Sequence, residues 1–168
     1  MAIDALVSGT SSDSYSTVLV ADAYHAAHLY GAPWVALSTD SKERGLKMAT
    51  RLLDERVTWY GLKTTETQAL RWPRSGVVSV DGFSILSDIV PHAISNATAE
   101  LARHLAATDS TVEASGKGIA SLNAGSVSLT FDKGDVADVI PAIVKEMLRG
   151  WGIVNKRSSF GAVPLVRT

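Results

Sequence analysis

Residues 40–57 read DSKERGLKMATRLLDERV, and the spacing within this stretch predicts the main helix of the fold. Asp40 is followed three positions later by Glu43, a pattern that resembles a capping box at a helix start. Side chains that suit a core then recur at intervals of three and four, with charged residues between them. The core set is Leu46, Ala49, Thr50, Leu53 and Val57. We therefore expect a long amphipathic helix.

Three further helices are expected around this one. One precedes it, beginning near Val20 and stopping before Gly31. Two follow it. The earlier of these has Pro91 in its first turn, where the missing N–H costs nothing, and the later has Pro141 near its start for the same reason. Helices thus dominate the expected structure.

Two short β-hairpins are expected between the helices. One lies near residues 76–87, where Asp81 and Gly82 supply a strong turn signal, and the other lies near 119–131. The expected fold class is mainly α within the α+β class: a small bundle of about four helices, one or two hairpin arms and an extended C-terminal tail.

Composition and length favour one domain with an arm. The chain has 168 residues, of which 46% are hydrophobic and 20% charged, a balance typical of a folded protein. We expect a helical domain over residues 1–154 and an extended arm over 155–168. The absence of cysteine excludes disulfides and thiolate metal sites.

The charge is nearly balanced overall but unevenly distributed. A net charge of −1 argues against binding to nucleic acid through the overall field of the protein. Residues 1–41 contain Asp but no Lys or Arg, whereas residues 145–168 contain five Lys or Arg against Glu146. This polarity suits head-to-tail association of identical subunits. A chance distribution over a solvated surface is the alternative.

Residues 68–74 read QALRWPR and place Trp72 between two arginines. Pro73 pushes the preceding residue toward extended geometry, so Trp72 is expected outside a helix. Its ring is an anchor within the fold, a partner contact or a stacking surface for nucleic acid. We favour the anchor, with Arg71 or Arg74 reaching a neighbouring subunit or a carboxylate.

A single-stranded nucleic-acid site is the alternative function that the aromatic residues suggest. Such a site would stack bases on aromatic rings interleaved with arginines. The residues in question are Trp59, Tyr60, Trp72 and Trp151, with Arg56, Arg71, Arg74 and Arg149. Aromatic residues at helix ends more often fill a core, so we interpret these rings as core residues.

Catalytic and metal sites are not expected. His25 and His28 follow Asp22 at intervals of three, a spacing that brings metal ligands toward one side of a helix. No second cluster completes the site, so a metal-dependent enzyme is the most distant alternative. The chain lacks the G-x-S-x-G and H-E-x-x-H patterns. We expect no enzyme activity and no cofactor.

The order of these segments resembles the head-to-tail connector, or adaptor, family of tailed bacteriophages. The resemblance runs through SYSTVLVADAYHAAH, LKMATRLLDERVTWYGLKT, QALRWPRSGV, VPHAISNATAELA, GSVSLTF and IPAIVKEMLRGW, in that order. It implies a structural virion protein, assembled in the host cytoplasm, that forms a ring, commonly dodecameric, in the phage neck. The implied partners are further copies of the chain, the portal protein and a tail-side stopper, terminator or tail protein, with genome DNA passing through the lumen.

Within that resemblance, certain residues are hypothesised to contact subunits or partners. They are Arg71, Trp72, Arg74, Lys156, Arg157, Phe160, Leu165 and Arg167. Some members of the family are labelled as DnaT-like proteins that bind single-stranded DNA. The near-neutral charge lends that label little physical support, so an accessory protein that binds single-stranded nucleic acid is kept as the alternative function.

Overall fold

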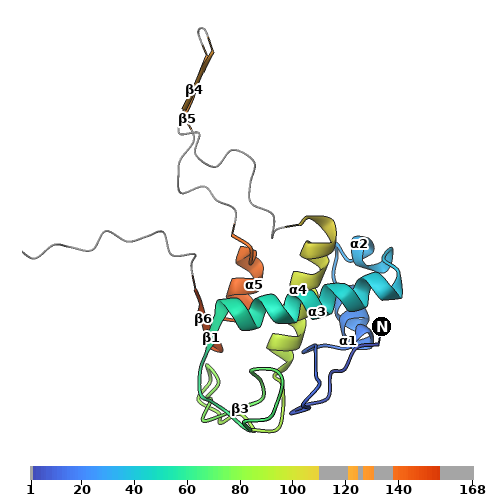
Figure 1. Cartoon of the computed structure of the whole chain (residues 1–168), viewed down its shortest axis with the longest axis vertical. Coiled ribbons are helices and arrows are strands. Elements are labelled where there is room, and N and C mark those ends of the chain that lie inside the picture. The colour runs from blue at the N-terminus through green and yellow to red at the C-terminus, as the bar shows by residue number, and fades with distance from the viewer. Residues whose placement is uncertain (1, 110–120, 125–126, 131–137, 156–168) are drawn as a thin grey trace, which may run out of the picture.

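Two long helices cross at the centre of the protein. The computed structural model describes residues 2–109, 121–124, 127–130 and 138–155. Helix α3 (Thr39–Arg56) packs across α4 (His92–Ala107), the most extensive contact between helices in the described chain (Figure 1). The Ser38 hydroxyl accepts the Ser41 N–H at 3.2 Å and so caps α3, two residues earlier than the expected Asp40 cap.

Three shorter helices complete the helical part. Helix α1 (Val18–Ala26) packs on α3 and α4, α2 (Ala32–Val35) lies against α1 and α4, and α5 (Ala142–Met147) packs on α4. The expected apolar spacing of α3 and α4 does face the core, which includes Leu46, Ala49, Leu53, Ile94, Ala97 and Leu101. Periodicity therefore predicted the central crossing correctly. No described helix combines the length and hydropathy needed to cross a bilayer.

Short antiparallel strand pairs flank the helices. Strand β1 (Val57–Trp59) pairs with β6 (Gly152–Val154), with Val57 opposite Val154. Strand β2 (Leu62–Lys63) pairs with β3 (Arg74–Ser75). Strand β4 (Ser121–Ala124) pairs with β5 (Val127–Thr130). The α+β class is thereby confirmed.

The hairpin predictions fared differently. Strands β4 and β5 confirm the hairpin near 119–131, and residues 125–126 between them lie outside the described residues. In the stretch 76–87 the hairpin is short: an isolated bridge joins Val78 and Ser84, the Ser79 N–H donates to the Phe83 carbonyl at 2.8 Å, and the Ile85 N–H donates to the Val77 carbonyl at 2.9 Å. The ribbon of β1 and β6 was not expected, because its strands lie far apart in the sequence and Val57 also fits the period of α3.

Candidate functional site

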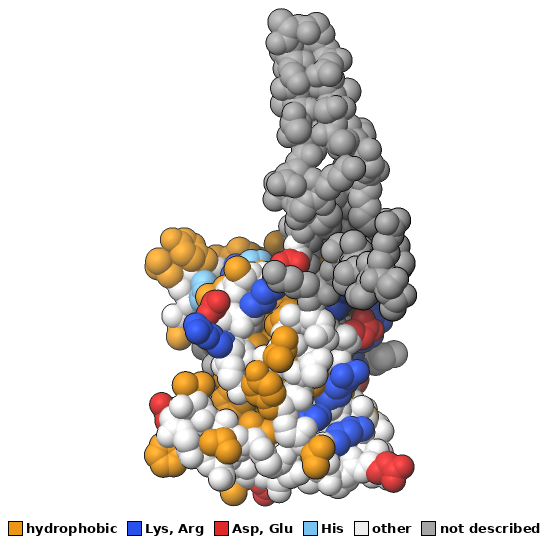
Figure 2. Space-filling view, turned by 90° about the vertical axis from the view of Figure 1, so that its left-hand side faces the viewer, with side chains coloured by type: hydrophobic (Ala, Val, Ile, Leu, Met, Phe, Trp, Pro, Cys, Tyr) orange, Lys and Arg blue, Asp and Glu red, His pale blue; other side chains and the backbone are white. Residues whose placement is uncertain are grey.

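Four basic side chains between residues 56 and 74 have no carboxylate within ion-pair distance among the described residues. They are Arg56, Lys63, Arg71 and Arg74, which we call the basic cluster. Glu66 is the one acidic residue in this stretch. Figure 2, which looks onto the side of β1 and β6, shows Lys and Arg side chains gathered on the lower part of that face beside hydrophobic ones.

Every other described Lys or Arg lies beside a carboxylate. The pairs are Lys42–Asp22, Arg44–Asp40, Lys47–Asp13, Arg51–Glu55, Arg103–Glu100, Lys145–Asp138 and Arg149–Glu146. Seven acidic residues therefore lie beside cations outside the basic cluster. The basic cluster keeps its positive charge, which the net charge of the chain conceals.

Strand β1 lies between Arg56, the last residue of α3, and Tyr60. Val57 and Trp59 are buried, whereas Thr58 and Tyr60 are exposed and Arg56 is half-buried. The Arg56 carbonyl accepts the Asn155 N–H at 2.8 Å, and the Tyr60 N–H donates to the Trp151 carbonyl at 3.0 Å. The backbone at both ends of β1 is therefore fixed against the segment that contains β6.

Arg74 ties the turn after β1 to the QALRWPR segment. Its Nε donates to the Tyr60 carbonyl and its Nη2 to the Gly61 carbonyl, each at 2.6 Å, while Nη1 donates to the Arg71 carbonyl at 3.1 Å. Burial lowers the pKa of Arg74, and the charge of nearby Arg71 lowers it further. The two guanidinium groups therefore repel each other, a cost that a bound anion would relieve.

Lys63 enters the cluster through strand pairing and through Gln68. Its Cα lies opposite that of Arg74 in the ladder of β2 and β3, and its Nζ donates to the Gln68 carbonyl at 2.7 Å. The buried Gln68 side chain accepts the Thr65 N–H and donates to the carbonyls of Leu70 and Pro73. One amide thereby holds the loop that presents Lys63 and Arg71.

A buried hydrogen-bond network holds the backbone at Arg71. The Tyr15 hydroxyl accepts the backbone N–H groups of Arg71 and Trp72 at 3.1 and 3.2 Å and donates to the Asp54 carboxylate. The other oxygen of Asp54 accepts the Arg71 N–H at 3.1 Å. Burial raises the pKa of Asp54, and it also raises that of Tyr15. Helix α3 thus fixes the backbone from which the exposed Arg71 side chain projects.

Trp72 is a core residue. Its side chain is 2% exposed, and its ring makes edge contacts with Trp59 and Trp151, each with a centroid distance of 6.0 Å. Trp59 is buried as well, and its Nε1 donates to Asp54 at 3.1 Å. These rings are unavailable for stacking on bases, as the core interpretation predicted, whereas Tyr60 is 44% exposed.

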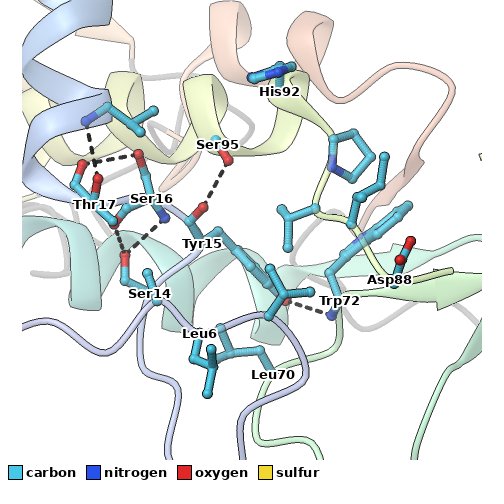
Figure 3. Close-up of a pocket in the computed structure, with 16 residues that line it drawn as sticks. Leu6, Ser14, Tyr15, Ser16, Thr17, Leu70, Trp72, Asp88, His92 and Ser95 are labelled. Atoms are coloured by element: carbon cyan, nitrogen blue, oxygen red, sulfur yellow. Dashed lines mark hydrogen bonds between the residues drawn. The ribbon is translucent and has the colours of Figure 1, made fainter. Parts of the chain in front are cut away.

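A mostly apolar pocket of about 400 Å³ is lined in part by the QALRWPR segment. Leu70 and Trp72 line it, whereas Arg71 between them does not (Figure 3). Leu6 and the start of α4 at His92 form further walls. The Nε1 of Trp72 is buried and without a hydrogen-bond partner. The pocket contains none of the basic cluster, so we regard it as separate from the charged site.

The histidine cluster does not form a metal site. The buried His25 places Nε2 3.1 Å from the Ala99 carbonyl, and burial lowers its pKa. Asp22 instead accepts hydrogen bonds from Trp34 Nε1 at 2.7 Å and Lys42 Nζ at 2.9 Å. Within the described ranges, no group of three or more potential ligands converges.

The hypothesised contact residues lie in different environments. Arg71 is exposed, Arg74 is half-buried on backbone carbonyls, and Trp72 is in the core. The remaining ones lie outside the described residues: Lys156, Arg157, Phe160, Leu165 and Arg167. Sequence reasoning missed Lys63, although an excess of cations between residues 56 and 74 was the available signal.

A comparison with protein families identifies the class of this chain. A family model described as "Putative DnaT-like ssDNA binding protein" matches residues 4–168. The chain therefore belongs to this family. No curated protein and no solved structure matches the chain.

The prediction of a bacteriophage head-to-tail connector is therefore wrong. The family match points to binding of single-stranded DNA. The predictions of a ring, of portal and tail-side partners and of a structural role in the neck are therefore wrong as well. The segments that carried the resemblance contain α1, α3, α4, α5, β5 and the core around Trp72. Any helical domain needs such apolar spacing, so the pattern did not specify the function.

Proposed function

We propose that the chain binds single-stranded DNA through the basic cluster, with the phosphates of the strand beside Arg56, Lys63 and Arg71. The observation that carries the proposal is the concentration in one stretch of every described Lys and Arg that lacks a carboxylate partner. Unpaired cations attract phosphates without first having to break an ion pair. The family description supports the same partner.

The arrangement of the cluster suits a flexible strand. Arg56 ends α3, the exposed Tyr60 follows β1, Lys63 lies in β2, and Arg71 lies on the loop before β3. Arg74, whose guanidinium is tied to three carbonyls, positions the other groups. Phosphate contacts of this kind carry no sequence information, and the proposal assigns no chemical step to the protein.

Fluorescence anisotropy of a labelled oligothymidylate, titrated with the protein at several salt concentrations, tests the proposal. We expect the logarithm of the binding constant to fall linearly with the logarithm of salt concentration. Arg71→Ala should lower the magnitude of that slope by about 0.7, the value for one lost phosphate contact on a single strand. Absence of saturable binding by the wild type would overturn the proposal.

A further inference from the structure

His25 lies where three helices meet. It belongs to α1, and it is 1% exposed. Its Nε2 lies 3.1 Å from the carbonyl oxygen of Ala99 in α4, and the centroid of its ring lies 4.8 Å from that of Trp34 in α2. Helices α1 and α2 pack together near one end of α3, whose other end leads into β1 (Figure 1). One buried imidazole therefore joins α1 to both α2 and α4.

The hydrogen bond of His25 defines its neutral tautomer. A carbonyl oxygen can only accept, so Nε2 carries the proton that it donates to Ala99. Nδ1 is then the unprotonated nitrogen, and it is buried without a hydrogen-bond partner among the described residues. Protonation would place an N–H and a positive charge at this atom. An unpaired buried charge is far more costly than an unpaired neutral acceptor.

Charged groups of α4 do not offset this cost. Burial lowers the pKa of His25, and Arg103 lowers it further, whereas the Ala99 carbonyl and Glu100 act in the opposite direction. The Glu100 carboxylate is paired with Arg103 and lies 3.3 Å from Nε2 of His104. It therefore has cationic partners of its own, and burial remains the main influence on His25.

The groups on the other elements around His25 also favour its neutral form. Asp22 of α1 accepts a hydrogen bond from Lys42 of α3 at 2.9 Å. The ring of Tyr24 makes an edge contact with that of His25, and the charge of His28 lowers the pKa of His25. Helix α2 reads APWV and has no titratable side chain. The neutral ring is therefore the form that fits this packing.

We propose that His25 is a pH-sensitive switch: the neutral ring holds α1 and α2 on α4, and its protonation releases these two helices while α3 stays packed on α4. Parts of a protein can open at a lower free energy than the whole, and the extensive contact between α3 and α4 does not involve His25. The contribution of the neutral ring is fully present above 6.5, the ordinary pKa of histidine. It is lost as the pH falls through the lower pKa of the folded protein. This inference does not depend on DNA binding.

Hydrogen exchange of the full chain, followed by mass spectrometry of peptic peptides, tests the switch. Protection of α1 and α2 is compared with that of α3 and α4 at pH 7 and at pH 5, after correction for the intrinsic pH dependence of exchange. We expect α1 and α2 to lose protection on acidification. Their opening equilibrium should rise by up to about tenfold per pH unit, the limit for one proton. Helices α3 and α4 should keep their protection.

Two substitutions assign the effect to His25. His25→Gln provides a side chain that does not titrate but still has an amide N–H for the Ala99 carbonyl. In this variant the change in protection between pH 7 and pH 5 should disappear, whatever the protection at pH 7. The matched control is His28→Gln, which removes a half-buried histidine three positions later and should respond to pH as the wild type does.

Side-chain NMR of the wild type tests the tautomer without any substitution. Long-range correlations between ring protons and ¹⁵N should show that, at pH 7, His25 has a proton on Nε2 and none on Nδ1. The midpoint of its titration should lie below 6.5. A proton on Nδ1 at pH 7 would contradict the hydrogen bonding on which the switch depends.

The exchange data can overturn the switch in two ways. If α1 and α2 keep their protection at pH 5, or if His25→Gln loses protection as the wild type does, His25 does not control these helices. Loss of protection in α3 and α4 at the same pH would overturn the local release, because the molecule would then unfold as one unit.

Discussion

The Tyr15 hydroxyl accepts the backbone N–H of Trp72 at 3.2 Å, linking the segment before α1 to a residue 57 positions later in the chain. The same hydroxyl accepts the Arg71 N–H and donates to Asp54 of α3. One buried oxygen therefore joins the helical core to the segment that presents the basic cluster. Stability and binding are coupled at this point.

Removing this hydroxyl should destabilise the protein. Tyr15→Phe leaves the buried N–H of Trp72 without its acceptor, and we expect the free energy of unfolding to fall by roughly 1 to 3 kcal/mol. Urea denaturation measures this change. Tyr30→Phe, which removes the hydroxyl of an exposed ring, is the control and should have little effect. Equal stability of the wild type and Tyr15→Phe would contradict the role assigned to the network.

Asp54 should make a distinct contribution to the pH dependence of stability. Burial raises its pKa in the folded state, so the folded protein binds the proton more tightly than the unfolded chain does. Its contribution is therefore fully present below the unfolded pKa and is lost as the pH rises through the folded pKa. Relative to Asp54→Asn, the wild type should gain stability as the pH falls from 7 toward 3.8, the ordinary pKa of an aspartate.

Comparing the two proteins isolates this group. Asp22 and Glu100 have lowered pKa values and lose their contribution on acidification, but they do so in the wild type and in Asp54→Asn alike. The difference between the two urea denaturation free energies at each pH therefore reports Asp54. A difference that stays constant, or that moves in favour of the variant on acidification, would show that Asp54 is not desolvated in the folded state.

Trp72 should be required for stability because of its ring. Trp72→Ala removes a buried ring packed on Trp59 and Trp151, and we expect a loss of roughly 3 to 5 kcal/mol in the free energy of unfolding. Trp72→Phe keeps an aromatic ring, and the lost N–H has no partner, so it should cost less. Denaturation curves for the three proteins check this order. Wild-type stability of Trp72→Ala would contradict the assignment of Trp72 to the core.

Gly61 should be needed to form the turn at the basic cluster. Gly61 and Gly76 both have φ of +71°, but a Cβ at Gly61 would lie 2.4 Å from the Ser75 carbonyl oxygen, whereas a Cβ at Gly76 has open space. Gly76→Ala should cost roughly 1 to 2 kcal/mol from backbone conformation alone. Gly61→Ala should cost about 1 to 3 kcal/mol more because of the clash, and it should also weaken DNA binding. Equal effects of the two substitutions on stability would show that the turn tolerates the extra atom.

The sequence predicted those parts of the fold that local pattern controls. Leu46, Leu53, Ile94 and Leu101 recur at helical intervals, and burying them required no knowledge of distant residues. The pairing of Val57 with Val154 is different, because it joins segments almost a hundred positions apart. The local pattern of either segment does not indicate which strand it pairs with. The turn signal in the 76–87 stretch is local as well, and this stretch does form a turn with a bridge between Val78 and Ser84, while Val80 and Phe83 stay exposed.

The candidate site was harder to predict than the fold, because it depends on which charges are already paired. The sequence displays Arg51 and Arg56 as equivalent residues five positions apart. Only the structure shows that Arg51 lies beside Glu55 and that Arg56 has no carboxylate within ion-pair distance among the described residues. Likewise, the sequence offers Trp59, Tyr60 and Trp72 equally as stacking surfaces. The structure shows that Trp59 and Trp72 are buried and that Tyr60 is exposed.

The most direct measurement is the salt dependence of single-stranded DNA binding for two variants with the same loss of charge. One combines Arg56→Ala, Lys63→Ala and Arg71→Ala in the basic cluster. The other combines Arg44→Ala, Arg51→Ala and Arg149→Ala, exposed cations that lie beside carboxylates. We predict that the first variant lowers the magnitude of the log-log slope by about 2, at 0.7 for each lost contact, and that the second retains the slope of the wild type. Equal losses in both variants would show that DNA responds only to overall charge and would contradict a site at the basic cluster.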